Sequence, residues 1–185
     1  HPGETNLKLA DVVIVNKIDS AKKKDIEEVI KNIKSVNPKA KIIKARSEVT
    51  VDKPELIKNK KVLIVEDGPT LTHGGMLFGA GTIAARKYNC KITNVKKYVK
   101  GSIKETYKKY PHLEKELPAM GYSKKQIKEL EKTINSVKCD AVIDATPVNL
   151  SKLIKINKPI ADVKYETGKE AKNEIKIILR KMKLI

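Results

Sequence analysis

The sequence has few of the residues and segments that mark several common protein classes. It contains two cysteines, Cys90 and Cys139, and no tryptophan among its 185 residues. Two cysteines without a C-x-x-C pair exclude a disulfide framework and a thiolate metal site, and we expect both to be buried small hydrophobic residues. No apolar run approaches the roughly 20 residues that cross a bilayer, and the first residues do not resemble a signal peptide. We therefore expect a cytoplasmic protein with no membrane partner.

Arginine and aromatic residues are also scarce, although the chain is strongly basic. The formal net charge is +18, from 40 Lys+Arg against 22 Asp+Glu, and the aromatic content is 4%. Only Arg46, Arg86 and Arg180 are arginines. Nucleic-acid readers depend on arginine and on stacking aromatics, so the composition favours a lysine-rich surface over a nucleic-acid partner. Attraction of a small, highly charged anion or of nucleic acid is the alternative that remains open.

The hydrophobic pattern alternates short apolar runs with amphipathic segments. The runs at 12–15, 61–65 and 141–144 are typical of buried parallel strands, and 42–43, 92–95 and 160–165 predict three more. Helices are expected at 21–36, 76–88, 102–110, 123–137 and 169–182, and Ser123 with Gln126 forms a capping-box pattern. This order predicts an α/β fold with a mostly parallel sheet and helices on both faces. We place a domain boundary in the polar stretch 50–60, giving residues 1–59 and 60–185, with a single domain as the alternative.

The sharpest motif follows the first apolar run and reads Asn16-Lys17-Ile18-Asp19. N-K-x-D after a buried strand is the base-recognition motif of P-loop GTPases. One carboxylate can accept hydrogen bonds from both N1–H and N2–H₂ of guanine, and the lysine stem covers the ring. We therefore predict that Asn16, Lys17 and Asp19 bind a nucleotide base. The alternative is that Asp19 or Ser20 caps the helix at 21–36.

Two further observations bear on the nucleotide. The next predicted strand ends in Ala45-Arg46-Ser47, where GTPases carry a second base-contacting loop, so Ala45 is a candidate whose backbone N–H meets the base. No G-x-x-x-x-G-K-[ST] occurs, so the residues that cradle the β and γ phosphates and hold Mg²⁺ are missing. We expect an N-terminal P-loop portion to be missing from this chain, which starts at His1, and the 185 residues alone to be inactive.

The segment 66–75 is the second candidate site. It follows the apolar run 61–65 and combines two acids, two threonines, a histidine and three glycines. Since parallel sheets bind ligands at the carboxyl ends of their strands, we predict catalytic roles for Asp67 and His73 and a Mg²⁺ ligand at Asp67, with Glu66 as the alternative ligand. Thr70, Thr72, Gly74 and Gly75 are the candidate substrate- or anion-binding residues. The alternative is a tight turn that Asp67 shapes.

Weaker candidates lie at two other turns. Gly101-Ser102 opens a predicted helix, so Ser102 is a candidate anion-binding residue, and Lys104 beside it a candidate catalytic cation. Thr146 follows the run 141–144 and is a further candidate for substrate binding. Ordinary turn chemistry is the alternative for each of these positions.

Four long blocks carry a family resemblance that extends to about Glu166. The blocks are PGETNLKLADVVIVNKID, VLIVEDGPTLTHGGMLFGAGTIAARK, GSIKETYKKYPHLEKELPAMGY and ATPVNLSKLIKINKPIADVKYE. They resemble the C-terminal part of cyclic 2,3-diphosphoglycerate synthetase and its GTPase-like relatives. The resemblance implies a longer archaeal, cytoplasmic ligase with a P-loop-NTPase-like fold. It would use ATP and Mg²⁺ to close 2,3-bisphosphoglycerate into a cyclic phosphoanhydride, with release of ADP and phosphate.

Two questions stay open at this level. The resemblance implies ATP, whereas Asp19 suits guanine, because adenine has no N1–H to donate; a GTP-binding protein of unknown role is therefore the alternative function. A basic nucleic-acid-associated protein is a third hypothesis that the composition does not favour. The sequence leaves the oligomeric state undecided, a homo-oligomer included.

Overall fold

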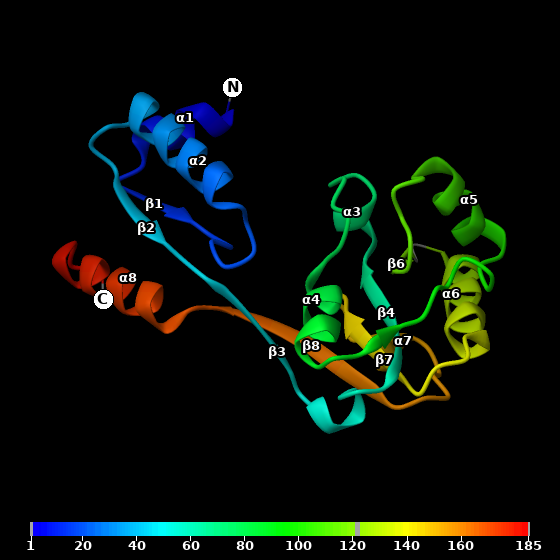
Figure 1. The fold of residues 1–185 in the computed structure, drawn as a ribbon. Helices are drawn as coiled ribbons and strands as arrows, with labels where there is room; N and C mark the ends of the chain where they lie inside the picture. Colours follow the sequence, from blue (N-terminus) through cyan, green and yellow to red (C-terminus); the bar gives the residue numbers. More distant parts are fainter. Residues whose placement is uncertain (1, 121–122, 185) are drawn as a thin grey trace. The chain divides into compact units, whose positions relative to one another are not determined.

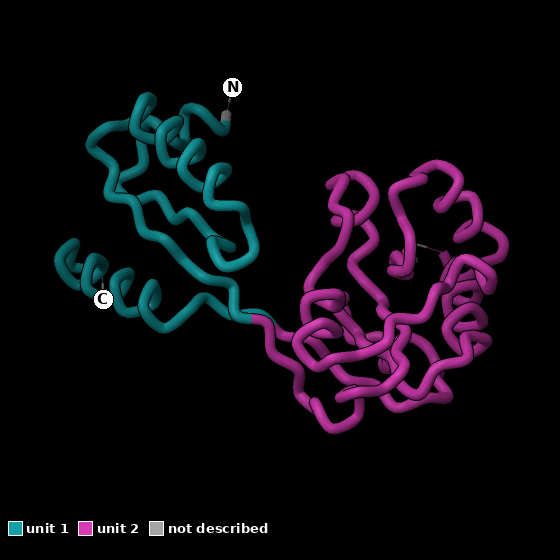
Figure 2. The backbone as a smooth tube through the Cα atoms, viewed as in Figure 1, with its two compact units in different colours: residues 1–48, 165–185 teal, residues 49–164 magenta. Residues whose placement is uncertain are grey.

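A computed structural model describes residues 2–120 and 123–184. The chain forms two compact units, which Figure 2 shows in different colours. Unit 1 comprises residues 1–48 and 165–185, and unit 2 comprises residues 49–164. The first division, after residue 48, lies just before the polar stretch 50–60, because Val51 and Ile57 pack into the core of unit 2, and the C-terminal helix returns to unit 1.

Unit 1 is built on two parallel strands. β1 (Val12–Val15) pairs with β2 (Lys41–Lys44), and both strands were predicted. The helices α1 (Pro2–Leu9) and α2 (Lys23–Val36) lie on one face of this sheet, and α8 (Lys169–Lys181) lies on the other (Figure 1). The buried side chains of Ile43, Ala45 and Ala171 form the centre of the contact with α8.

The expectation that the run 12–15 is a fully buried strand was wrong. Only Val15 is buried in β1, and Ile14 is 47% exposed. Within the described part of the chain β1 pairs with a single neighbour, and α8 packs over β2. An apolar strand with one open edge presents unpaired backbone groups and apolar side chains to its surroundings.

Unit 2 contains the larger sheet. Its strand order is β3 (Ser47–Val51), β8 (Ile160–Thr167), β7 (Ala141–Ala145), β4 (Lys61–Asp67) and β5 (Lys91–Ile92). β6 (Leu117–Ala119) pairs with the carboxyl half of β4, and β4 is parallel to β5, β6 and β7. This sheet confirms the predicted α/β class with a mostly parallel sheet.

Side chains of alternating residues in the central strands pack into two hydrophobic cores of unit 2. Val62 and Ile64 pack with α4 (Ala80–Lys87) on one face. Leu63 and Val65 pack on the other face, in a core shared with α5 (Gly101–Lys109) and α6 (Lys124–Ser136). Burial on both faces explains why these strands read as continuous apolar runs. None of the helices in the described ranges is long and apolar enough to cross a membrane.

Several element boundaries differ from the predictions. The predicted helix 76–88 begins only at Ala80, and the predicted strand 92–95 is the two-residue β5. The short helices α3 (Gly68–Leu71) and α7 (Leu150–Leu153), like α1, β3 and β6, were not predicted. Residues Pro54–Leu56 form a 3₁₀ helix, and the capping box of Ser123 and Gln126 at α6 is confirmed.

Candidate functional site

The structure brings the two predicted base-contacting loops of unit 1 together. The backbone N–H of Ser47 donates to Asp19 Oδ1 at 2.8 Å, and the N–H of Ile18 donates to the Ala45 carbonyl oxygen at 3.2 Å. Both loops follow the carboxyl ends of the parallel strands β1 and β2. Lys17 adopts a left-handed backbone conformation, with φ of 61°, which turns the chain sharply before Asp19.

The helix-capping alternative for this loop was wrong. α2 begins at Lys23, and the residue at its N-cap, Lys22, makes no side-chain capping hydrogen bond. The Ser20 hydroxyl donates to the Lys17 carbonyl at 3.3 Å, and Asp19 bonds Ser47 instead of the helix. The exposed carboxylate of Asp19 is therefore held by the second loop, and its role in base recognition stays a prediction.

The other residues predicted to bind the base differ in how accessible they are to a ligand. The side chains of Asn16 and Lys17 are exposed. Ala45 is fully buried, and its N–H donates to the Val15 carbonyl oxygen at 2.9 Å, so this N–H already belongs to the sheet. Ala45 therefore ties the two loops together and offers no free donor to a base. Its predicted role as a backbone donor does not fit this geometry.

The 66–75 loop of unit 2 is organised by its own hydrogen bonds. Asp67 caps α3, because its Oδ2 accepts from the Thr70 backbone N–H at 3.2 Å and from the Thr70 hydroxyl at 2.6 Å. The buried Thr72 hydroxyl donates to the Gly68 carbonyl at 2.8 Å. The backbone N–H groups of Gly74 and Gly75 donate to Pro69 and Thr72. These contacts are those of the turn alternative, and the ligand-binding role of the loop stays a prediction.

The side chains that could bind a metal allow one limited test of the predicted Mg²⁺ site. Within residues 2–120 and 123–184, no group of three or more His, Cys, Asp or Glu side chains is placed to hold a metal ion. Asp67 Oδ1 accepts no hydrogen bond there, so Asp67 fits as one carboxylate ligand only. Mg²⁺ commonly takes one or two carboxylates and completes its shell with waters and phosphates, so the fit depends on a bound nucleotide.

His73 belongs to an aromatic cluster that the sequence reading missed. The Tyr110 hydroxyl lies 3.3 Å from His73 Nδ1, and the two rings meet edge to face with centroids 5.8 Å apart. His112 Nε2 lies 2.7 Å from the Leu71 carbonyl oxygen. Tyr110 therefore orients the His73 ring and leaves its Nε2 outside this contact. The run Tyr-Pro-His at 110–112 was the sequence signal, but nothing local linked it to a histidine 37 residues away.

Two buried acids lie close together near the carboxyl end of β4: Glu66, one of the two acids noted in the 66–75 segment, and Glu116, just before β6, which the sequence reading missed. Glu66, on β4, accepts from the Thr82 backbone N–H at 3.1 Å, and the Thr82 hydroxyl donates to Glu116 at 2.9 Å. Both acids are less than 10% exposed. Burial raises the pKa of Glu66 to about 7, while hydrogen bonds from the backbone of Thr82, Gly81 and Gly79 oppose the rise and Glu116 adds to it. One residue, Thr82, thus joins two carboxyl groups in the interior, through its backbone N–H and its hydroxyl.

Glycine allows this close approach of Glu66 to the start of α4. A Cβ at Gly79 would lie 2.3 Å from Glu66 Oε2, and one at Gly81 would lie 2.6 Å from Ile64 Cγ2. The carboxylate therefore occupies the N-terminus of α4, where it interacts favourably with the helix dipole. It also explains why the helix predicted to start at residue 76 starts at Ala80.

The predicted anion site at Ser102 already holds an anionic group of the protein. Glu129 Oε2 accepts from the Ser102 backbone N–H at 2.9 Å and from its hydroxyl at 2.5 Å. These bonds hold the pKa of Glu129 below its usual range. Lys104 is exposed in the first turn of the same helix. The carboxylate of Glu129 thus occupies the position that we predicted for a ligand.

Thr146 lies beside a third buried acid. Its hydroxyl donates to Asp144 Oδ1 at 2.7 Å and also contacts the Val148 carbonyl oxygen, and Asp144 Oδ2 accepts from the Leu150 N–H at 3.0 Å. In the register of the sheet Val65 is opposite Asp144, and Glu66 is opposite Ala145 and Pro118. Glu66 and Glu116 therefore share one region at the carboxyl edge of the sheet of unit 2, whereas Asp144, opposite Val65, lies on the other face of the sheet from Glu66.

Comparisons with known proteins bear on both units. Residues 2–44 match the family described as CobW/HypB/UreG, nucleotide-binding domain. The chain is 57% identical over 180 residues to a protein of Thermococcus kodakarensis named arginine synthetase ArcE, and this alignment covers 97% of the chain. The chain spans 40% of the length of that relative. The family match contains the N-K-x-D motif and lies within unit 1, and the similarity to the synthetase includes both units.

Proposed function

We propose that this chain is part of a nucleotide-dependent synthetase whose product is arginine, and that unit 1 binds the base of the nucleotide. The observation that carries the nucleotide site is the hydrogen bond between Asp19 and Ser47, which holds the acid of N-K-x-D against the second loop. The match of residues 2–44 to a nucleotide-binding domain supports the same site. The name of the relative supports arginine as the product.

The acidic side chains at the carboxyl edge of the sheet in unit 2 agree with arginine as the product. The side chains of Glu66 and Glu116 are buried there and are joined through Thr82. A guanidinium group is a planar cation that pairs well with carboxylates. A substrate with two phosphates would instead be repelled by them, since like charges close together in a poorly solvated site are costly.

The proposal assigns the phosphate-binding part of the nucleotide site to a segment outside these 185 residues. The chain contains no G-x-x-x-x-G-K-[ST], and phosphoryl transfer depends on positioned phosphates and Mg²⁺. We propose that a P-loop-bearing portion supplies them in the cytoplasm and that ATP, or alternatively GTP, is the nucleotide. Asp67, His73 and Lys104 remain the candidates for catalysis in unit 2.

A second candidate is the conversion of 2,3-bisphosphoglycerate to its cyclic anhydride with release of ADP and phosphate. The specific observation in its favour is the lysine excess, which gives a net charge of +18 and suits a small, highly charged anion. It differs from the first proposal in the sign of the charge that the substrate presents to unit 2.

Calorimetric titration of the full-length protein separates the two candidates. Arginine and 2,3-bisphosphoglycerate are titrated separately, each with nucleotide and Mg²⁺ present. The proposal expects arginine to bind and Glu116→Gln to weaken it, while a surface control, Glu105→Gln, leaves it unchanged. Binding of 2,3-bisphosphoglycerate with formation of a cyclic product, and no binding of arginine, would establish the second candidate.

A further inference from the structure

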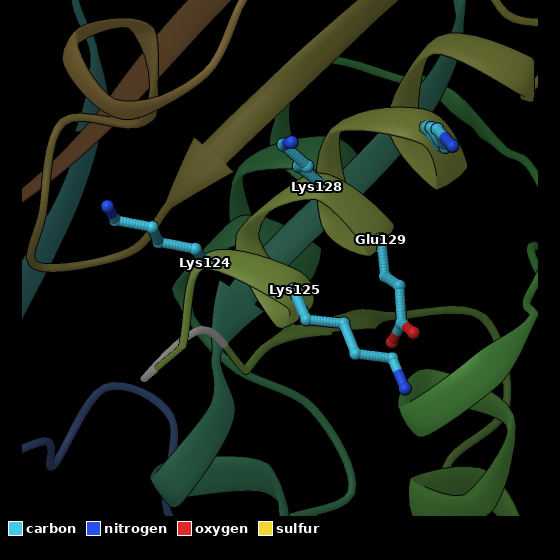
Figure 3. A pocket seen from close by; sticks show the side chains of 5 residues that line it. Lys124, Lys125, Lys128 and Glu129 are labelled. Atoms are coloured by element: carbon cyan, nitrogen blue, oxygen red, sulfur yellow. The ribbon is translucent and has the colours of Figure 1, made fainter.

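Three lysines form a stripe along α6. Lys124, Lys128 and Lys132 recur at every fourth residue and are exposed, and we call them the α6 lysine stripe. Residues four apart lie on the same side of a helix. Together with Lys125 and Glu129 they line one surface hollow (Figure 3).

The one acid in this hollow does not neutralise the stripe. Its Oε2 accepts hydrogen bonds from the backbone N–H and the hydroxyl of Ser102, at the start of α5, so Glu129 is already engaged there. Figure 3 shows Lys125 extending in the direction of Glu129, while Lys124 and Lys128 point away from it. No residue of the stripe forms an ion pair with any acid that the structure describes.

Folding does not account for this arrangement. Like charges four residues apart on a helix repel each other, and cations in the first turn oppose the helix dipole. α6 begins with Lys124 and has no acid in its first turn, although Ser123 and Gln126 cap it well. Charges that are unfavourable in the isolated chain become favourable when an anion binds, and departures of this kind are expected at functional surfaces.

We propose that the α6 lysine stripe binds the phosphate backbone of a nucleic acid. With a rise of about 1.5 Å per residue, neighbouring lysines lie about 6 Å apart along the axis, and the outer two about 12 Å apart. A row of ammonium groups suits a linear polyanion, whereas a compact phosphate needs donors that converge on one point. The scarcity of arginine and aromatic residues makes the contact independent of base sequence, because lysines on phosphates carry no base readout. The proposal is independent of the synthetase function.

The test compares two triple variants of the full chain. Lys124→Gln, Lys128→Gln and Lys132→Gln together remove the stripe. The matched control replaces Lys169, Lys176 and Lys181 on α8, which are exposed, lie on a helix of the same length and carry the same total charge. Binding of a fluorescein-labelled oligouridine of about 20 nucleotides is measured by anisotropy between about 50 and 300 mM salt. Circular dichroism establishes that both variants are folded.

The proposal predicts a change in the salt dependence that is specific to α6. Three lost phosphate contacts lower the slope of log K against log salt by about 2, and affinity at about 0.1 M salt falls on the order of 100-fold. The α8 variant keeps the wild-type slope within about one unit. Equal losses of affinity in both variants would show that total charge alone determines binding, and would overturn the proposal. Absence of binding at about 50 mM salt, or preference for inorganic triphosphate over the oligonucleotide, would overturn it as well.

Discussion

The substitution Asp19→Asn tests the base site with little change in shape. In the structure Asp19 Oδ1 accepts the Ser47 N–H at 2.8 Å, and the other oxygen is available to a ligand. An asparagine can keep the first bond through its carbonyl oxygen, so the two loops stay together. It then presents an NH₂ group to the base in place of a carboxylate oxygen.

The expected loss follows from the hydrogen bonds that change. Bonds to a charged group contribute about 1.5–3 kcal/mol each, and guanine donates two to one carboxylate. A loss of about 3 kcal/mol corresponds to an affinity for GTP lower on the order of 100-fold. Xanthine carries an acceptor where guanine carries its N2 amino group, so the variant should gain affinity for XTP. If adenine is the base, Asp19 accepts from the N6 amino group alone and the loss for ATP is smaller.

The assay is calorimetric titration of the full-length protein with GTP, ATP and XTP. The control is Asp25→Asn, which removes the same charge from the first turn of α2, away from the loop. Equal affinities of the Asp19 variant and the wild type for all three nucleotides would refute the base-site reasoning. A similar loss in the Asp25 variant would show that net charge, and no specific hydrogen bond, determines binding.

Three further predictions concern unit 2. Because the pKa of Glu66 is about 7 in the fold against 4.5 ordinarily, the native state retains a proton that the unfolded chain releases. Its contribution to stability therefore falls by about 3 kcal/mol as the pH rises through this window, and Glu66→Gln should flatten denaturant-derived stability there. Gly79→Ala brings a Cβ to 2.3 Å from Glu66 Oε2 and should lower stability by about 2 kcal/mol, whereas Gly168→Ala, with its nearest atom at 3.5 Å, should not; equal thermal midpoints would contradict this. Asp67→Ala removes the cap that bonds Thr70 and should cost about 1 kcal/mol; normal turnover by the folded full-length variant would make Asp67 purely structural.

The elements that the sequence predicted best are those with a local physical signature. The runs 61–65 and 141–144 became β4 and β7, because a central strand that is covered on both faces is apolar on both sides. The capping box at Ser123 was readable because its partner is three residues away. The predictions failed where an element is short or is shaped by distant contacts, as in β6 and in the late start of α4.

The candidate site could be predicted only in part, for the same reason. N-K-x-D identified Asp19, but its bond to Ser47 joins residues 28 positions apart and required the register of β1 and β2. The carboxylate that accepts hydrogen bonds from Ser102 belongs to Glu129, 27 residues away on another helix. Neither separation leaves a periodic or local pattern in the chain.

The sequence by itself determined the α/β class, most of the helices and strands, and the residues of the loop that we propose for base recognition. Hydrophobic periodicity and hydrogen bonds between near neighbours encode these features directly. Only the tertiary structure decided which acids are buried together, as Glu66 and Glu116 are through Thr82, and which predicted ligand positions the protein fills with its own groups. Strand register and packing set these contacts, because they bring together side chains whose separation in the chain no local rule constrains.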